Sequence, residues 1–403
     1  GRVDTLEGKV ATLERQQFST TTKLTGEVIF APFAGSDGRV TTVDVNTTIP
    51  GIGVTSTPSS DRSNLAFGAR ARLNFDTSFT GRDLLRTRLQ TGSFQQLNRA
   101  LGSGTSTRLG FDGDTNNTFE IDDFFYRFPI GNTTVWVAPR LGADTVINTL
   151  SPVESSGGGS VSRFGRYPAA IRIGGTNFLL GTRFTLPQGQ LNLMYGSNNP
   201  AGVSGEGGIF AGGNSKLAAQ IVWQPNRNFD LGFTYSYDYL AAANLGSGTN
   251  TAGEILPGAV KMNANTILGQ LRWSFARNVN LFAWGSWTFA STLPPTAAIN
   301  SGNTGTFTSW MAGLSFADLL NRGDLAGIMF GQPFYLASFS GNNNVNPFTS
   351  SFYTTPYHLE AFYRFRVTGN ISITPAVFFV FNPNNDSRNG TATVGVLRTT
   401  FTF

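Results

Sequence analysis

The sequence predicts an all-β fold: a 16-stranded antiparallel transmembrane β-barrel with a short N-terminal coiled-coil helix. Three observations support this prediction. Hydrophobic and polar residues alternate along many runs of strand length, and the connections between these runs alternate between short and long. The mean hydropathy of −0.09 is what one expects when one face of each strand meets lipid and the other meets water.

The composition excludes several classes of protein. Charged residues make up 13% of the chain, about half of the roughly 25% that is typical of soluble domains. No run approaches the ~18 consecutive apolar residues that a transmembrane helix needs. The absence of cysteine excludes disulfides and thiolate ligands. The net charge is +5 without a basic run, so we expect no nucleic-acid partner.

The first eighteen residues differ from the rest of the chain. Val3, Leu6, Val10 and Leu13 recur at spacings of three and four, which is a short heptad pattern. We therefore expect residues 1–18 to be the end of a coiled coil, which would imply an oligomer, and residues 19–403 to form the barrel domain. A lone amphipathic helix would have the same pattern. The chain begins at Gly1 without a signal peptide, and we interpret it as a mature or trimmed fragment.

Period-two alternation then predicts the strands. In residues 228–239, Phe233 and Tyr235 share one face, whereas Thr234 and Ser236 share the other. Counting such runs gives sixteen predicted strands: 21–31, 64–76, 82–93, 119–129, 133–141, 175–186, 190–197, 215–224, 228–239, 264–275, 279–290, 307–318, 323–331, 356–367, 370–381 and 392–403. Many of these runs are long enough to cross a bilayer at a tilt of about 45°.

Three of the predicted strands alternate poorly, and which face lies outward is left open there. They are residues 119–129, 279–290 and 323–331. The first holds the acidic cluster Glu120, Asp122 and Asp123, which cannot all face lipid. We expect these acids to lie near a strand end or opposite arginines.

The lengths of the connections give the strongest single signal. Short turns follow the even-numbered strands, and long loops rich in Gly, Ser, Asn and Thr follow the odd-numbered ones: 32–63, 94–118, 142–174, 198–214, 240–263, 291–306, 332–355 and 382–391. Outer-membrane barrels have short periplasmic turns and long outer loops, whereas a soluble sandwich has no reason to separate loop lengths in this way.

The C-terminal strand ends on Phe403. A final aromatic residue after alternating apolar positions resembles the signal that the barrel assembly machinery of the outer membrane reads. This machinery is therefore an expected partner, together with outer-membrane lipids and lipopolysaccharide. We expect the chain to lie in a bacterial outer membrane.

Few residues suggest catalysis. The single histidine, His358, has the parity of a lumen-facing residue, whereas outer-membrane phospholipases place their catalytic groups toward lipid. One histidine without cysteine leaves only carboxylates for a transition metal. We expect no enzyme activity, no metal site and no cofactor. A hydrolase that uses His358 remains an alternative.

Arginines in alternating strand positions form the main charged feature. If their apolar neighbours face lipid, they line the lumen together with one carboxylate: Arg70, Arg72, Arg86, Arg88, Arg183, Arg272, Glu360, Arg364 and Arg366. Arg398 has the same parity. Four of these arginines share one hairpin, where they would repel one another without carboxylates, counter-ions or water between them.

The segment from Phe18 to Phe30 follows directly on the heptad pattern and reads FSTTTKLTGEVIF. This junction resembles the major outer-membrane porins of cyanobacteria, which are often called iron uptake porins and belong to the carbohydrate-selective, OprB-like superfamily. The resemblance covers essentially the whole chain. It implies a homotrimer that passes small inorganic ions, iron among them. The surface-layer-homology domain that such porins carry is absent from this chain.

In general porins the third long loop folds into the barrel and narrows it. Here that loop would be 142–174, and its candidate constriction residues are Asp144, Glu154, Arg163 and Arg166. Wall arginines that face loop carboxylates would set up a transverse field at the constriction. Alternatively, the charges only solvate the lumen and hold the loop. Because wall arginines outnumber the assignable wall carboxylates Asp230, Asp238 and Glu360, we predict a mild attraction for anions.

We predict a passive outer-membrane diffusion channel for small hydrophilic solutes, chiefly inorganic ions, with iron as a candidate. Three alternatives stay open: a sugar-preferring porin, the hydrolase described above, and a structural link between envelope layers.

Overall fold

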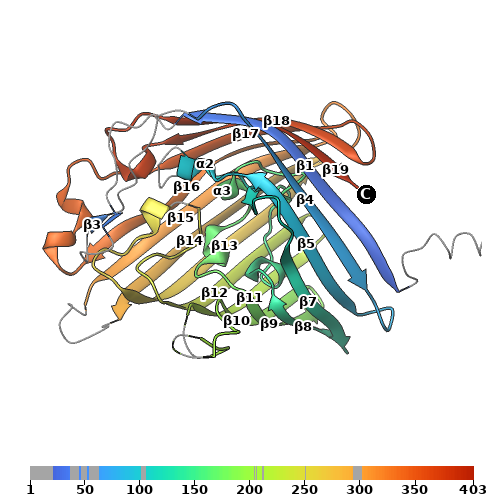
Figure 1. Ribbon diagram of the computed structural model, residues 1–403, viewed down its shortest axis with the longest axis horizontal. Coiled ribbons are helices and arrows are strands. Elements are labelled where there is room, and N and C mark those ends of the chain that lie inside the picture. The colour runs from blue at the N-terminus through green and yellow to red at the C-terminus, as the bar shows by residue number, and fades with distance from the viewer. Residues whose placement is uncertain are drawn as a thin grey trace, which may run out of the picture.

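The computed structural model is a closed antiparallel barrel (Figure 1). The structure describes residues 21–36, 45–46, 52–53, 63–100, 106–203, 205, 207–210, 213–249, 251–293 and 302–403. The predicted coiled coil at 1–18 lies outside these residues. The main sheet has 17 strands, one of which is the two-residue β6 (Gly113–Asp114) of a loop, and the remaining sixteen form the wall.

The wall strands pair in chain order, and β1 closes the barrel by pairing with both β4 and β19. Their bounds are β1 (Thr22–Ser36), β4 (Ala66–Thr77), β5 (Leu84–Phe94), β7 (Glu120–Ile130), β8 (Thr133–Arg140), β9 (Phe178–Leu186), β10 (Gly189–Ser197), β11 (Ser215–Asn226), β12 (Phe229–Leu240), β13 (Lys261–Ala276), β14 (Val279–Leu293), β15 (Thr304–Ala317), β16 (Leu325–Ser340), β17 (Tyr357–Arg366), β18 (Ile371–Phe381) and β19 (Ala392–Thr402). The predicted fold class is confirmed.

One predicted strand was much too short. Residues 323–331 are only the first part of β16, which continues to Ser340. The pairing of β16 with β15 shifts register between Thr308 and Trp310, opposite a segment that contains Pro333. Proline has no N–H to donate, and a β-bulge reverses the alternation beyond it. The period-two pattern is therefore interrupted at Pro333, although the strand continues with its faces exchanged.

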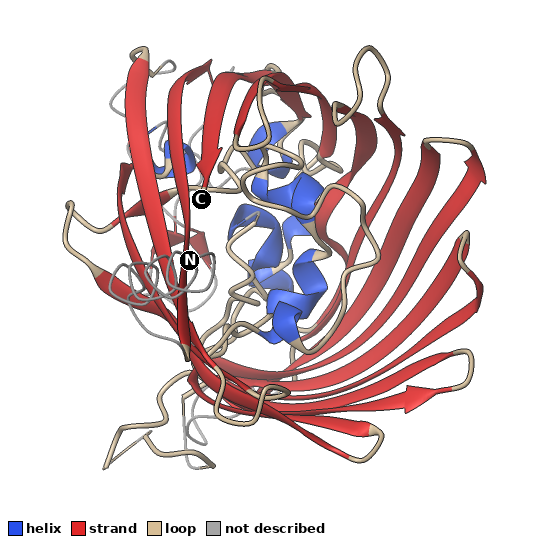
Figure 2. Cartoon of the chain, turned by 90° about the vertical axis from the view of Figure 1, so that its right-hand side faces the viewer, coloured by secondary structure: helices blue, strands red, loops and turns tan. Residues whose placement is uncertain are grey.

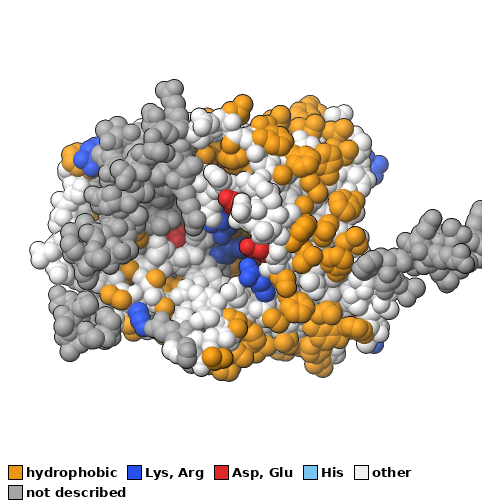
Figure 3. All heavy atoms as spheres, in the orientation of Figure 1, with side chains coloured by type: hydrophobic (Ala, Val, Ile, Leu, Met, Phe, Trp, Pro, Cys, Tyr) orange, Lys and Arg blue, Asp and Glu red, His pale blue; other side chains and the backbone are white. Residues whose placement is uncertain are grey.

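Burial along the strands is the reverse of that in a soluble protein. In β12, Leu231 and Phe233 are 45% and 51% exposed, whereas Asp230 on the other face is 3% exposed. Hydrophobic side chains cover much of the outer surface, and charged side chains gather in a hollow at the centre of the view (Figure 3). The strands thus turn apolar residues toward lipid and polar residues toward the lumen. No helix in the described part of the chain is long and apolar enough to cross a membrane.

The poorly alternating strands have large apolar residues on both faces. In β14, Trp287 and Phe289 point outward and are exposed, while Phe282 and Trp284 point inward and are buried. Met329 of β16 is buried on the inner face in the same way. These inward residues pack against a loop inside the barrel, and this second apolar face conceals the period-two pattern.

The two ends of the barrel domain meet at Gly26 and Phe403. The amide of Gly26 donates to the carbonyl of Phe403 at 2.7 Å, and the reverse bond measures 3.1 Å. A Cβ added at Gly26 would lie 2.3 Å from the Phe403 ring. The glycine of the Thr-Gly-Glu junction therefore makes room for the terminal aromatic residue at the seam of the barrel.

Candidate functional site: the constriction of the lumen

The third long loop folds into the barrel. Residues 141–177, here the constriction loop, contain the short helices η1 (Ala143–Thr145), α3 (Arg163–Arg166) and η2 (Ala169–Arg172). These helices lie inside the ring of strands (Figure 2). Amide hydrogen bonds, an apolar cluster and buried charges attach the loop to different parts of the wall.

Two glutamines on the wall bind the first part of the loop. Gln220 of β11 accepts from the amide of Asn148 at 2.8 Å and donates to its carbonyl at 2.9 Å. Gln270 of β13 donates to the same carbonyl at 2.9 Å and accepts from the amide of Leu150 at 3.0 Å. Arg183 donates to the Asn148 side chain at 2.7 Å. These side chains satisfy backbone groups that no neighbouring strand could reach.

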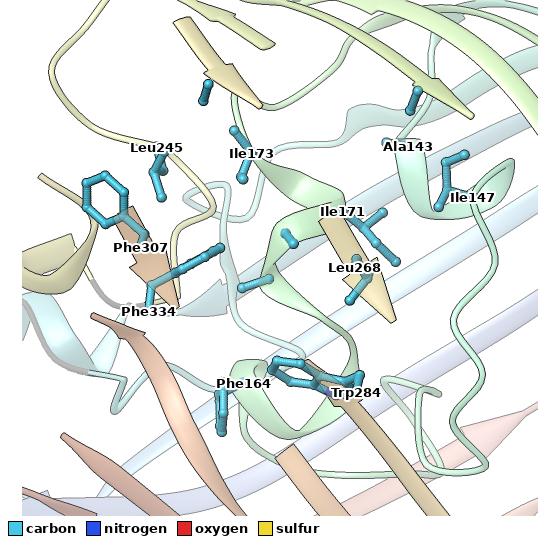
Figure 4. Close-up of a cluster of buried hydrophobic side chains, with 14 of the residues drawn as sticks. Ala143, Ile147, Phe164, Ile171, Ile173, Leu245, Leu268, Trp284, Phe307 and Phe334 are labelled. Atoms are coloured by element: carbon cyan, nitrogen blue, oxygen red, sulfur yellow. The ribbon is translucent and has the colours of Figure 1, made fainter. Parts of the chain in front are cut away.

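An apolar cluster fixes the helical part of the loop (Figure 4). Phe164 of α3 meets the Trp284 ring edge-on, with ring centroids 5.3 Å apart. Ile171 of η2 lies near Leu268 of β13 in the same cluster. Full burial of one such side chain away from water contributes about 1.5–3 kcal/mol. The lumen therefore contains a hydrophobic core on this side.

A buried glutamate holds the segment that follows Gly159. Glu360 of β17 has no exposed surface. Its carboxylate accepts from the hydroxyl of Ser160 at 2.8 Å and from the amide of Val161 at 2.7 Å. The hydroxyl of Ser162 also donates to it. Every one of these donors comes from the constriction loop.

Two buried arginines bind the neighbouring loop segment. Arg398 of β19 donates to the carbonyls of Ser156 at 2.9 Å and Gly159 at 2.7 Å. Arg70 of β4 donates to the Ser156 hydroxyl at 2.9 Å and pairs with Glu27 of β1 at 2.5 Å. We call Glu360, Arg398 and Arg70 the anchor group. Sequence reasoning placed Arg70 and Glu360 on an open pore wall, but the loop covers them.

A second loop contributes to the same packing, and sequence reasoning missed it. Residues 106–118 lie against the constriction loop: the amide of Gly110 donates to the carbonyl of Val161 at 2.7 Å. Leu109 and Phe111 are fully buried beside Val161. The signal was present, because two large apolar residues flank a glycine in an otherwise polar connection.

Next to the anchor group, the wall strands β4, β5 and β7 carry paired charges. We call these residues the arginine ladder: Arg72, Arg86, Arg88, Asp76, Asp122 and Asp123. Arg86 holds Asp76 through two hydrogen bonds of 2.7 and 2.6 Å. Arg88 lies 2.5 Å from Asp123, and Arg72 lies 3.2 Å from Asp122. These side chains are about a fifth to a quarter exposed, so they remain in contact with lumen water.

A β-bulge explains how adjacent acids reach the same wall. Arg88 is paired with Asp123 across β5 and β7, but the next residue, Leu89, is paired with Ile121. Asp122 is therefore the extra residue of a bulge, which lets both carboxylates approach Arg88. Asp122 and Asp123 oppose arginines as expected, and Glu120 lies at the strand end, as the first residue of β7.

The constriction loop presents charges of its own. Arg172 pairs with Asp144 at 2.6 Å, while Arg166 donates to the carbonyl of Glu154 at 2.8 Å. Loss of surrounding water and the nearby Asp144 carboxylate raise the pKa of Glu154 to about 7, and Arg166 opposes this rise. Arg163 stacks on the ring of Tyr167, 5.8 Å from its centroid.

The remaining predicted residues lie elsewhere. Arg272 pairs with Asp230 on β12 and β13, away from the ladder. Arg364 donates to the carbonyl of Gly158 at 3.1 Å, beneath the loop. Arg366 lies at the end of the barrel with the short turns. The predicted arginine set is therefore several sites rather than one.

His358 points inward, as its parity predicts, and it is packed away from the open lumen. It is fully buried, with ring centroids 5.0 Å from Phe164 and 5.2 Å from Phe378. Its Nε2 lies 3.6 Å from Glu360. Across the described residues, no group of three or more His, Cys, Asp or Glu side chains is arranged to hold a metal ion.

The sequence profile described as carbohydrate-selective porin, OprB family, matches residues 1–403. The uncharacterized protein sll0772 of Synechocystis sp. is 35% identical, over all of this chain and 72% of its own length. The uncharacterized protein alr4550 of Nostoc sp. is 32% identical, over all of this chain and 69% of its own.

Solved structures share the fold. The high-pH structure of Pseudomonas putida OprB has a TM-score of 0.59 and 13% identity, over 98% of this chain and 97% of that one. The anion-selective porin from Comamonas acidovorans has a TM-score of 0.53 and 8% identity, over 95% of this chain and 99% of that one. At such identities the likeness concerns the fold alone.

Proposed function

The chain belongs to the OprB family of carbohydrate-selective porins, and on that premise we propose that its channel passes small sugars together with the inorganic ions that accompany them. Family and fold are those of an outer-membrane channel rather than an enzyme. Passage is passive diffusion between the arginine ladder and the constriction loop.

The pairing of charges at the constriction carries this proposal. Arg72, Arg86 and Arg88 each lie within 3.2 Å of a carboxylate. Paired charges offer hydrogen-bond donors and acceptors at short range. Their opposite fields largely cancel a few ångströms away, and salt screens what remains beyond a Debye length of about 8 Å. A sugar can replace its hydrogen bonds to water with hydrogen bonds to these paired groups, whereas a single ion gains little electrostatic attraction from them.

Osmotic swelling of proteoliposomes tests the proposal. Vesicles containing the protein should swell in isosmotic glucose or arabinose at rates well above those of empty vesicles. A protein that conducts ions across planar bilayers but gives no swelling in either sugar would contradict the choice of solute and leave the porin assignment in place.

A second candidate function is an ion channel with a mild preference for anions, which retains iron salts as candidate solutes. The observation that favours it is a set of lumen arginines that form no ion pair with a described carboxylate: Arg163, Arg166 and Arg183. The paired acids of the ladder weaken the excess of positive charge that the sequence predicts. The reversal potential under a KCl gradient distinguishes a selective ion channel from a weakly selective sugar channel.

We also propose that the porin is a homotrimer in contact with lipopolysaccharide and outer-membrane lipids, and that the assembly machinery recognises the strand ending at Phe403. The seam between Gly26 and Phe403 supports the last point, because Phe403 extends the pairing of β19 with β1 where the barrel closes. Native mass spectrometry of the detergent-solubilised protein should give a mass of three chains. The predicted coiled coil at 1–18 stays a prediction.

A further inference from the structure

A polar cavity of about 250 Å³ lies beneath the constriction loop, at the end of the barrel with the short turns. In outer-membrane barrels this end faces the periplasm. Its walls come from β1, β17, β18 and β19, which lie side by side (Figure 1). Gly157 and Gly158 of the loop cover it, and a Cβ at Gly157 would lie only 2.1 Å from Glu27.

Two guanidinium groups give this cavity a positive charge. Arg364 donates to the carbonyls of Gly158 and Gly323, both at 3.1 Å. Arg366 donates from Nε to the carbonyl of Thr368 at 3.3 Å. Among the described residues neither arginine forms an ion pair with a carboxylate, so both charges remain uncompensated at contact distance.

Glu27 in the lining and Asp324 beside it already have partners. Glu27 pairs with Arg70 at 2.5 Å. Asp324 accepts from the hydroxyl of Tyr363 and from the backbone amide of Arg366, both at 2.8 Å, and it moderates the charge of Arg364 without contacting it. The lining itself holds two arginines and one carboxylate, so an anion that enters the cavity meets a net positive charge there.

Hydroxyl and amide groups complete the lining. Ser372, Thr400 and Thr402 come from β18 and β19, and Asn370 comes from the turn between β18 and β17. Such groups hydrogen-bond to hydroxylated ligands, and they accept as well as donate. The cavity is smaller than the about 300–1,000 Å³ typical of sites for drug-sized ligands, so it suits a ligand of about one sugar ring.

We propose that this cavity is an exit subsite for a monosaccharide that carries a carboxylate or a phosphate. The anionic group binds the forks of Arg364 and Arg366, since a guanidinium pairs with such groups through two parallel hydrogen bonds. The sugar hydroxyls bind the serine and threonine side chains. This inference rests on the proposed function, because the solute reaches the cavity after it passes the constriction.

Single-channel recording in planar bilayers tests the proposal. Glucose 6-phosphate added on the side of the short turns should interrupt the KCl current in a concentration-dependent way, and the block should weaken as ionic strength rises. Glucose and inorganic phosphate should each block at least about ten-fold more weakly, because each lacks one half of the recognised chemistry.

Arg366→Gln should raise the concentration of glucose 6-phosphate needed for half block by about ten-fold, since it removes one charged hydrogen-bond donor. Arg277→Gln removes a charge from the turn between β13 and β14, outside the cavity, and should leave the block unchanged. Circular dichroism spectra confirm that each variant is folded.

Several results would overturn the inference. They are equal block of wild type and Arg366→Gln, block by inorganic phosphate as strong as that by glucose 6-phosphate, and block only from the side of the long loops. Each of these requires a conducting channel. A protein that forms no channel at all would instead contradict the proposed function.

Discussion

The lumen contains two groups of charged residues on neighbouring strands of the same side of the barrel, and they have different roles. The anchor group of Arg70, Arg398 and Glu360 is buried and binds backbone and hydroxyl groups of the constriction loop. The ladder residues Arg72 and Arg88 face water and pair with carboxylates. Burial and type of partner, rather than residue type, determine whether a lumen charge holds the loop or tunes passage.

The energetics differ accordingly. Removal of one member from a buried charged network costs about 3–5 kcal/mol, because its partners are left unsatisfied in a medium of low dielectric. Exposed ion pairs contribute only about 0–1 kcal/mol. Substitutions in the anchor group should therefore alter stability and pore size, whereas substitutions in the ladder should alter ion selectivity.

The largest effect is expected for Glu360→Ala. It leaves the amide of Val161 and the hydroxyls of Ser160 and Ser162 without their acceptor, so the unfolding free energy should fall by about 3 kcal/mol or more. The freed loop should also make the single-channel current noisier. Thermal unfolding and current recordings check this, with Asp76→Asn in the ladder as the matched control. Equal losses in both variants would remove the distinction between the two groups.

Phe164→Ala tests whether the apolar side of the loop is as important as the anchor group. The change removes the contact with Trp284, and the loss should be about 2–4 kcal/mol, since a loop at the edge of water can partly collapse around the cavity. Phe348→Ala, at an exposed position of a long loop, serves as the control. A loss below about 0.5 kcal/mol would show that the charged contacts hold the loop alone.

The double variant Arg86→Gln/Arg88→Gln should leave stability within about 1 kcal/mol of wild type. It frees Asp76 and Asp123 from their partners, so the reversal potential under a KCl gradient should shift toward cation selectivity. Arg272→Gln, which frees Asp230 outside the ladder, should shift it less. Identical shifts of the reversal potential in the two variants would mean that the ladder does not control ion selectivity more than other lumen charges do.

The smallest expected effect is a change of ion selectivity with pH. The pKa of Glu154 is about 7, raised from its ordinary value, so this carboxyl is mostly neutral at pH 6 and mostly charged at pH 8. Preference for anions should therefore weaken as the pH rises through 7. Reversal potentials at the two pH values measure the change, and Glu154→Gln should abolish it. Persistence of the change in that variant would assign it to another group.

The sequence predicted the barrel because its signals are local. Alternation within each strand and the parity of loop lengths depend on residues close together in the chain. The contents of the lumen depend on distant ones: the bonds from Ser160 and Val161 to Glu360 join residues about two hundred positions apart. No local pattern reports which wall a loop will contact.

Some structural features that the sequence analysis did not predict are nevertheless visible as irregularities in the sequence. The poor alternation of 279–290 arises from the inward aromatic residues Phe282 and Trp284, and Trp284 contacts Phe164 of the loop. The adjacent acids Asp122 and Asp123 mark the bulge in β7. Apolar residues on both faces of a barrel strand are thus a sign that something packs inside. The division of the arginines into anchor and ladder left no such trace.

The most direct test of the account compares swelling rates in glucose and in the trisaccharide raffinose, for vesicles that contain wild type or Glu360→Ala. If the anchored loop narrows a sugar-passing pore, wild type should pass glucose much faster than raffinose, and release of the loop should bring the two rates closer together. A wild type that passes neither sugar, or a ratio that Glu360→Ala leaves unchanged in a folded channel, would contradict the account.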